Sequence, residues 1–167
     1  MAALVLVLLR PLPAVAQTDD AAMLYAALSE SLDADADRPV PRLPRVAIDP
    51  SGDTTIVFAI RNEHDDASAI REGAVSDTLT VLRTVYAAAP VASVSSVTVL
   101  GTFAFKGTKA KRVRESPVLR AVLSAEHAQG LDWQRLAPAD LPTIVDTWWL
   151  QGAFATVDDQ LEEGPPP

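Results

Sequence analysis

The residues whose types and spacing depart most from the rest of the chain form a basic segment at 106–114. It carries five bases, which include all three lysines of the chain: Lys106, Lys109, Lys111, Arg112 and Arg114. A loop tip with this charge could dock on phosphate, an acidic polymer or a membrane surface. It lacks the interleaved aromatic side chains of a site for single-stranded nucleic acid. We therefore take these five side chains as candidate ligand-binding residues. The alternative is a solvated loop tip, or a site for the acidic tail of the protein itself.

The two histidines, His64 and His127, do not stand at a metal-binding spacing with another ligand. His64 lies within Glu63-His64-Asp65-Asp66, where it could share a weak divalent ion with carboxylates. We favour a polar loop there, because metal ligands must converge in space and adjacency in sequence does not make them do so.

The alternating acids of 33–37 resemble the opening of a calcium-binding loop. The sixth and twelfth positions of that loop need glycine and glutamate, but here they are Arg38 and Pro44. A solvated linker is therefore the better interpretation, and we predict neither a metal nor a cofactor.

Common catalytic signatures are missing from the chain. It has no cysteine, no Gly-x-Ser-x-Gly or Ser-x-x-Lys motif and no glycine-rich phosphate loop. A pair of carboxylates stays open as a catalytic device, because the chain has 22 acids and the test is a distance. The sequence favours a non-catalytic binding module of unknown ligand. The alternatives are a cell-surface hydrolase that uses paired carboxylates and His64, or an anchor to an anionic polymer or lipid through 106–114.

The first sixteen residues have the pattern of a secretory signal. An apolar run, Ala2–Leu9, is followed by Pro-Leu-Pro and by Ala14-Val15-Ala16, which predicts cleavage after Ala16. The run is shorter than the roughly 20 residues that span a bilayer. The only base, Arg10, follows the run, so a truncated anchor is the alternative. We expect an extracytoplasmic protein that meets a protein, an anionic polymer or a membrane surface, and, if it is exported, we do not expect nucleic acid as a partner.

The rest of the chain divides by composition. Residues 17–44 hold a short helix, expected at 20–32, and a linker rich in proline and aspartate. Residues 45–154 form the expected domain. Residues 155–167 are an acidic tail that ends in prolines, and with 17–44 they carry most of the formal charge of -8.

Periodicity predicts the elements of the domain. Strands are expected at 45–49 and 54–62, joined by a Pro-Ser-Gly turn, and again at 94–105 and 117–123. Helices are expected at 66–89, after Ser124 up to Gly130, and over 136–150. The order β-β-α-β-β-α favours an α+β fold with a single antiparallel sheet of about four strands, covered on one face by helices.

The three tryptophans, Trp133, Trp148 and Trp149, could line a ligand groove. In the expected helix over 136–150, the last two share a stripe with Ile144 and Val145. We therefore assign the tryptophans to the core, because a chain with only 5% aromatic residues buries most of them.

The C-terminal half also resembles a family. Over about 94–154, the motifs Leu131-Asp132-Trp133, Leu141-Pro142 and Trp148-Trp149-Leu150, with Asp146, resemble a group of uncharacterised exported or lipid-anchored small α+β domains of bacteria. The resemblance implies an extracytoplasmic setting and supplies no catalytic residues. The lipid-anchored cysteine that is frequent in that group is missing here.

Overall fold

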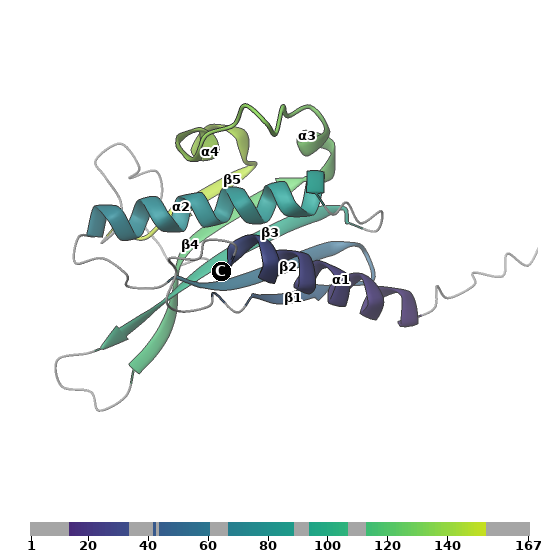
Figure 1. Cartoon of the computed structure of the whole chain (residues 1–167), viewed down its shortest axis with the longest axis horizontal. Helices are drawn as coiled ribbons and strands as arrows, with labels where there is room; N and C mark the ends of the chain where they lie inside the picture. Colours follow the sequence, from purple (N-terminus) through teal and green to yellow (C-terminus); the bar gives the residue numbers. More distant parts are fainter. Residues whose placement is uncertain are drawn as a thin grey trace, which may run out of the picture.

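The structure, a computed structural model, describes residues 14–33, 42, 44–60, 67–88, 94–106 and 113–152. These residues form an α+β unit with one open, mixed sheet of five strands in the order β1-β2-β3-β4-β5 (Figure 1). The elements, in chain order, are α1 (Ala14–Leu32), β1 (Arg45–Ile48), β2 (Asp53–Ile60), α2 (Ala67–Arg83), β3 (Ser96–Lys106), β4 (Val113–Ser124), α3 (Ala125–Gln129), α4 (Leu141–Ile144) and β5 (Thr147–Leu150). A π-helical turn, Thr84–Ala88, extends α2, and a 3-10 turn, Pro138–Asp140, precedes α4.

The hairpin predicted at the start of the domain is confirmed. β1 and β2 pair antiparallel, and Gly52 between them has a φ of 88°, a conformation that glycine adopts without strain. The Asp49 carboxylate accepts hydrogen bonds from the Ser51 backbone N–H (2.8 Å) and hydroxyl (2.6 Å) and from the Asp53 N–H (3.0 Å). The bond from the Ser51 hydroxyl is the main cause of a lowered pKa at Asp49. The turn is therefore held by its own side chains.

The expectation of an antiparallel sheet is wrong at its centre, where β2 and β3 run parallel. The register pairs Asp53 with Ser96 and Ile60 with Phe103. A parallel pair needs a long crossover, and α2 with its π-helical turn supplies it between the two strands. The prediction of about four strands also missed β5, so the sheet is mixed and has five strands.

The core lies between the sheet and the two long helices, which pack on the same face (Figure 1). On β2, Ile56, Phe58 and Ile60 are buried, as the alternation predicted. The helix expected at 20–32 is present within α1 and adds Leu24, Leu28 and Leu32 to this core. None of the described helices is both long and apolar enough to cross a bilayer.

A buried ion pair joins the segment before β1 to α2. Arg42 and Asp77 are 3% and 2% exposed, and the Arg42 Nε donates to Asp77 Oδ2 over 2.9 Å. The Arg42 carbonyl also accepts from the Ala59 N–H (3.2 Å), next to the end of β2. These contacts tie the entry of the sheet to the middle of α2.

The helix expected over 136–150 is confirmed only over Leu141–Ile144, and the expectation is wrong for the residues after it. α4 ends at Ile144, and Val145 turns the chain to φ -95° and ψ 152°, which is extended backbone. Thr147, Trp148 and Trp149 then form β5 on the open edge of β4. β-branched and aromatic residues favour strands, and the free edge of β4 gives them a partner. The tryptophan pair is therefore split between the two faces of the sheet.

Candidate binding site

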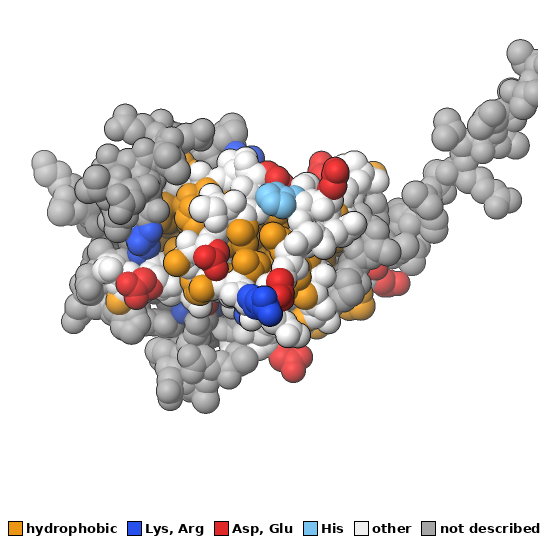
Figure 2. Space-filling model, turned by 90° about the horizontal axis from the view of Figure 1, so that it is seen from above, with side chains coloured by type: hydrophobic (Ala, Val, Ile, Leu, Met, Phe, Trp, Pro, Cys, Tyr) orange, Lys and Arg blue, Asp and Glu red, His pale blue; other side chains and the backbone are white. Residues whose placement is uncertain are grey.

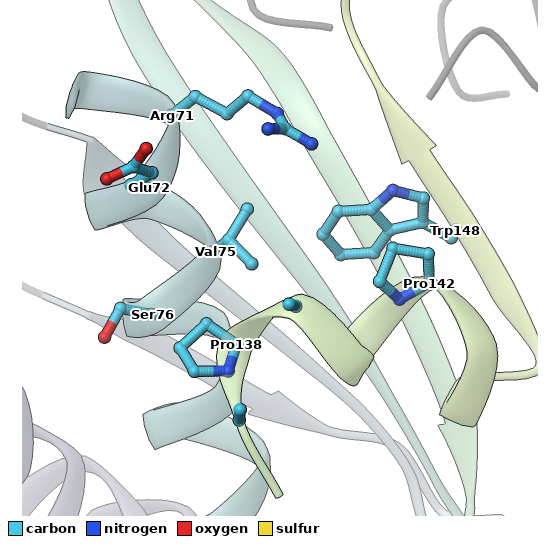
Figure 3. Close-up of a pocket in the computed structure, with 9 residues that line it drawn as sticks. Arg71, Glu72, Val75, Ser76, Pro138, Pro142 and Trp148 are labelled. Atoms are coloured by element: carbon cyan, nitrogen blue, oxygen red, sulfur yellow. The ribbon is translucent and has the colours of Figure 1, made fainter. Parts of the chain in front are cut away.

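A cavity of about 610 Å³ lies between α2 and the segment 137–142 that precedes β5 (Figure 3). One wall consists of residues on successive turns of α2, and the other consists of the 3-10 turn and the start of α4. Trp148 of β5 closes one side. The lining residues are Arg71, Glu72, Val75, Ser76, Ala137, Pro138, Ala139, Pro142 and Trp148. Most of this lining is apolar, and its polar side chains are few.

The second wall is held in place by hydrogen bonds. Within it, the Asp140 carboxylate accepts from the Ala137 N–H (2.8 Å), and the Thr143 hydroxyl donates to the Asp140 carbonyl (2.8 Å). Arg83, the last residue of α2, reaches across and donates to the carbonyls of Trp133 (3.0 Å) and Leu136 (3.1 Å). The loop before the cavity is therefore fixed to the same helix that forms the first wall.

The side of the sheet on which Trp148 lies follows from the register of β5. Trp148 pairs with Ala121, which is on the core face, whereas Trp149 pairs with Arg120 on the opposite face. Trp148 is 8% exposed, and its indole nitrogen, Nε1, is buried without a hydrogen-bond partner in the described part of the chain. Figure 3 shows the six-membered ring pointing toward Val75 and Nε1 on the side of the cavity where the Arg71 guanidinium lies. The assignment of Trp148 to the core thus holds for its burial, but one edge also faces a cavity.

A second polar cluster lies at the start of β5. The Asp146 carboxylate accepts from the Ser124 N–H (2.6 Å) and from Nδ1 of His127 (2.9 Å). The bond with His127 is the main cause of a lowered pKa at Asp146. A histidine held by a carboxylate in this way can act as a base through its other nitrogen. The Ser124 hydroxyl is not the partner of the His127 ring. It accepts from the His127 backbone N–H (3.4 Å), as the predicted cap of α3. The cluster therefore ties β4, α3 and β5 together.

The ring of Tyr86, in the π-helical turn after α2, stacks on the ring of Trp133, and the ring centroids are 5.9 Å apart. The Tyr86 hydroxyl donates to the Leu123 carbonyl over 2.6 Å. Burial, followed by the negative charge of Asp146, raises the pKa of Tyr86 far above its ordinary value. The hydroxyl stays a hydrogen-bond donor that joins the π-helical turn to β4.

The cavity and the sequence-derived candidates are different sites. Lys106 ends β3 and Arg114 lies in β4, where it pairs with Phe105 in the backbone register. Lys109, Lys111 and Arg112 lie outside the described residues, as does His64. Glu72 is the one carboxylate among the described residues that line the cavity, so these residues do not include the paired acids of the hydrolase hypothesis.

The acids expected to form a linker are described only in part. The Asp33 carboxylate accepts from the Arg42 N–H (3.0 Å), whereas Asp35 and Asp37 lie outside the described residues. Within the described ranges, no three histidine or acidic side chains converge as metal ligands would.

Sequence reasoning missed the cavity because its walls come from two parts of the chain, 71–76 in α2 and 137–148, that lie more than 60 residues apart. The proline pair at 138 and 142 and the run Thr147–Leu150, which has high strand propensity, were the available signals. Compared with known proteins, the chain matches no family model, no curated protein and no solved structure.

Proposed function

We propose that this chain is a non-catalytic binding module, and that the cavity between α2 and 137–142 holds a small, mainly apolar ligand. The observation that carries the proposal is the cavity itself. Its volume of about 610 Å³ lies in the range of small-molecule sites, which are mostly apolar and have a few polar groups. Seen from the side of α3 and α4, apolar side chains also gather in the middle of the face between separate charges (Figure 2).

The test fills the cavity and measures binding of an apolar fluorescent probe, anilinonaphthalene sulfonate. Ala139 lines the cavity and is exposed on a short turn, so Ala139→Phe adds a ring there with little effect on the fold. We expect probe affinity to fall about tenfold, because the added ring takes the volume of the ligand. The matched control is Ala87→Phe, at an exposed position that does not line the cavity. Equal affinities for the two variants and the wild type would remove the cavity as the binding site.

We also propose that the module works outside the cytoplasm. The apolar run Ala2–Leu9 and the Ala14-Val15-Ala16 motif support this. Cleavage after Ala16 leaves the three core leucines of α1 in the mature chain. Mass spectrometry of the protein from separate cell fractions tests the proposal. A chain that starts at Gln17 outside the membrane supports it, and an intact Met1 in the cytosol contradicts it.

A second candidate function is attachment to an anionic surface through 106–114. The β3–β4 hairpin supports it, because no other described strand lies beside its end. β2 pairs with β3 only as far as Phe103, and β5 pairs with β4 only from Leu119 onward. The hairpin extends away from the helices (Figure 1). Replacing the five bases with glutamine should abolish salt-sensitive binding to vesicles that contain anionic lipid. Unchanged binding would leave the loop as a solvated tip.

A further inference from the structure

Trp148 supplies an unused hydrogen-bond donor beside the cavity. The indole is more than nine-tenths buried, and Nε1 has no partner among the described residues. Leaving a buried donor unpaired is unfavourable, and most buried polar groups in proteins are paired. An indole N–H can only donate. A ligand that completes this site must therefore present a hydrogen-bond acceptor to Trp148.

The charge beside Trp148 indicates which acceptor fits. Arg71 and Glu72 are the charged residues in the lining. Figure 3 shows the Arg71 guanidinium on the side of Trp148 Nε1 and the Glu72 carboxylate directed away from the cavity. The Ser68 hydroxyl lies 3.5 Å from Glu72 Oε1, on the preceding turn of α2. One end of the cavity thus combines a cation with a neutral donor, and the remaining walls are mostly apolar.

We propose that the ligand is an amphiphilic monocarboxylate, with an apolar body against Val75, Pro138 and Pro142 and a carboxylate at the Arg71–Trp148 end. This inference rests on the proposed function of the cavity and specifies the chemistry of its ligand. The guanidinium and a carboxylate match in charge and in planar geometry. Trp148 Nε1 donates to one carboxylate oxygen, which satisfies the buried donor.

The same end favours a single negative charge over two. Among the described residues of the lining, Glu72 adds one negative charge on the same helix as the positive charge of Arg71. A phosphate monoester carries close to two charges at neutral pH and would meet more repulsion from Glu72 than a carboxylate does. We therefore expect the cavity to bind a carboxylate most tightly. A phosphate monoester and a neutral alcohol should both bind less tightly than the carboxylate.

The experiment compares probes that share one apolar body. Decanoate, decyl phosphate and decanol are titrated into the full-length, ¹⁵N-labelled protein, with hexanoate and dodecanoate to vary the length. Calorimetry gives the affinities. The ¹⁵N–¹H spectrum shows the indole N–H signals of Trp133, Trp148 and Trp149, and a hydrogen bond to the carboxylate moves the Trp148 signal downfield. We expect decanoate to bind about tenfold more tightly than decanol, because a hydrogen bond to a charged acceptor is stronger than one to a neutral acceptor.

Two variants test the indole N–H donor and the guanidinium cation one at a time. Trp148→Phe removes Nε1 and keeps an aromatic ring, and its control is Trp149→Phe, on the other face of the same strand. Arg71→Gln removes the cation, and its control is Arg135→Gln, whose side chain is 88% exposed and does not line the cavity. Each cavity variant should lower decanoate affinity about tenfold and lower decanol affinity by much less, because the bond that decanol loses is to a neutral acceptor. The controls should change neither affinity.

The outcomes distinguish the inference from the proposed function. Tighter decanoate binding with a downfield Trp148 signal supports both. Equal affinities for decanoate and decanol, with backbone shifts in α2 and 137–142 but none at the Trp148 indole, refute the carboxylate and keep the cavity as an apolar site. Preference for decyl phosphate also overturns the monocarboxylate. If no probe of any length binds or moves the lining signals, both the inference and the proposed function are refuted.

Discussion

Substitution of Gly101 by alanine tests how tightly the sheet packs beneath the helices. Gly101 lies on the core face of β3 and pairs with Phe58 of β2 and Leu119 of β4. A Cβ atom built on it would lie 2.8 Å from Ile60 Cδ1 and 3.2 Å from Leu119 Cβ. Carbon atoms in good contact are about 3.5 to 4.0 Å apart. The added methyl group therefore forces its neighbours to move.

Two opposing effects determine how much Gly101→Ala changes the free energy of unfolding. Overpacking a core typically costs about 1 to 3 kcal/mol. Replacing glycine in a strand returns about 0.5 to 1 kcal/mol, because the unfolded chain loses freedom. Ile60 Cδ1 ends a flexible side chain that is 6% exposed, whereas Leu119 Cβ is fixed to its strand. We expect Gly101→Ala to lower the free energy of unfolding by about 1 to 2 kcal/mol, which is the overpacking cost less the stability that replacing glycine returns.

Urea unfolding followed by tryptophan fluorescence measures this change in a double-mutant cycle. Ile60→Val removes Cδ1 and alone costs about 0.5 to 1.5 kcal/mol. With the clash at Ile60 gone, the double variant should be less destabilised than the sum of the two single variants, by about 1 kcal/mol. Ile56→Val, on the same face of β2 but not among the nearest contacts of Gly101, is the control and should be additive. Additivity for Ile60 within about 0.3 to 0.5 kcal/mol, or a stabilising Gly101→Ala, would refute this account of the packing.

Three further predictions concern α2 and the start of β5. Gly73→Ala should stabilise the protein by up to about 1 kcal/mol in urea unfolding, because a Cβ there meets nothing within 4 Å and alanine favours a helix. Asp77→Ala should destabilise it by about 3 kcal/mol or more in the same assay, because it removes the carboxylate that pairs with the buried Arg42, and Asp77→Glu should restore part of the loss. Asp146→Asn should cost about 1 kcal/mol at neutral pH, because the bond to the His127 ring loses its charge. The lowered pKa of Asp146 means that the charged form stabilises the fold fully above the ordinary value of 3.8 and less as pH falls through the folded-state pKa. In thermal unfolding against pH, the difference between wild type and variant should therefore begin to shrink as pH falls below 3.8 and vanish below the folded-state pKa of Asp146, and a constant difference would contradict the assignment.

Patterns among neighbouring residues were sufficient to predict the buried face of β2 and the two ends of α3. The alternation of Ile56, Phe58 and Ile60 gave the buried face of β2, because neighbouring strand residues point to opposite faces. Ser124 and Gly130 gave the two ends of α3, because a hydroxyl caps the first turn. These features depend on a few neighbouring residues, and the structure confirms them.

Strand pairing depends on more distant contacts, and there the sequence was insufficient. Alternation along 94–105 is the same whether β3 runs parallel or antiparallel to β2, so the direction had to be assumed. Over 136–150, Leu141, Ile144, Val145 and Trp148 fit helical spacing, although the strand propensity of Thr147, Trp148 and Trp149 prevailed beside an open edge. The cavity then followed from tertiary contacts alone, since it joins α2 to residues more than 60 positions away.

The register of β5 connects the Asp146 cluster to the cavity. A shift by one residue would turn every side chain of this strand to the other face, so that Trp149 would replace Trp148 beside α2. The Asp146 N–H donates to the Val122 carbonyl (2.8 Å) at one end of the pairing, and the Gln151 N–H donates to the Val118 carbonyl (2.7 Å) at the other.

At the first of these ends, the Asp146 carboxylate adds its bonds to His127 and Ser124. The carboxylate and imidazole that resemble part of a catalytic site therefore have a structural role. They fix a strand of four residues so that one indole N–H faces the cavity, where a ligand can accept its hydrogen bond.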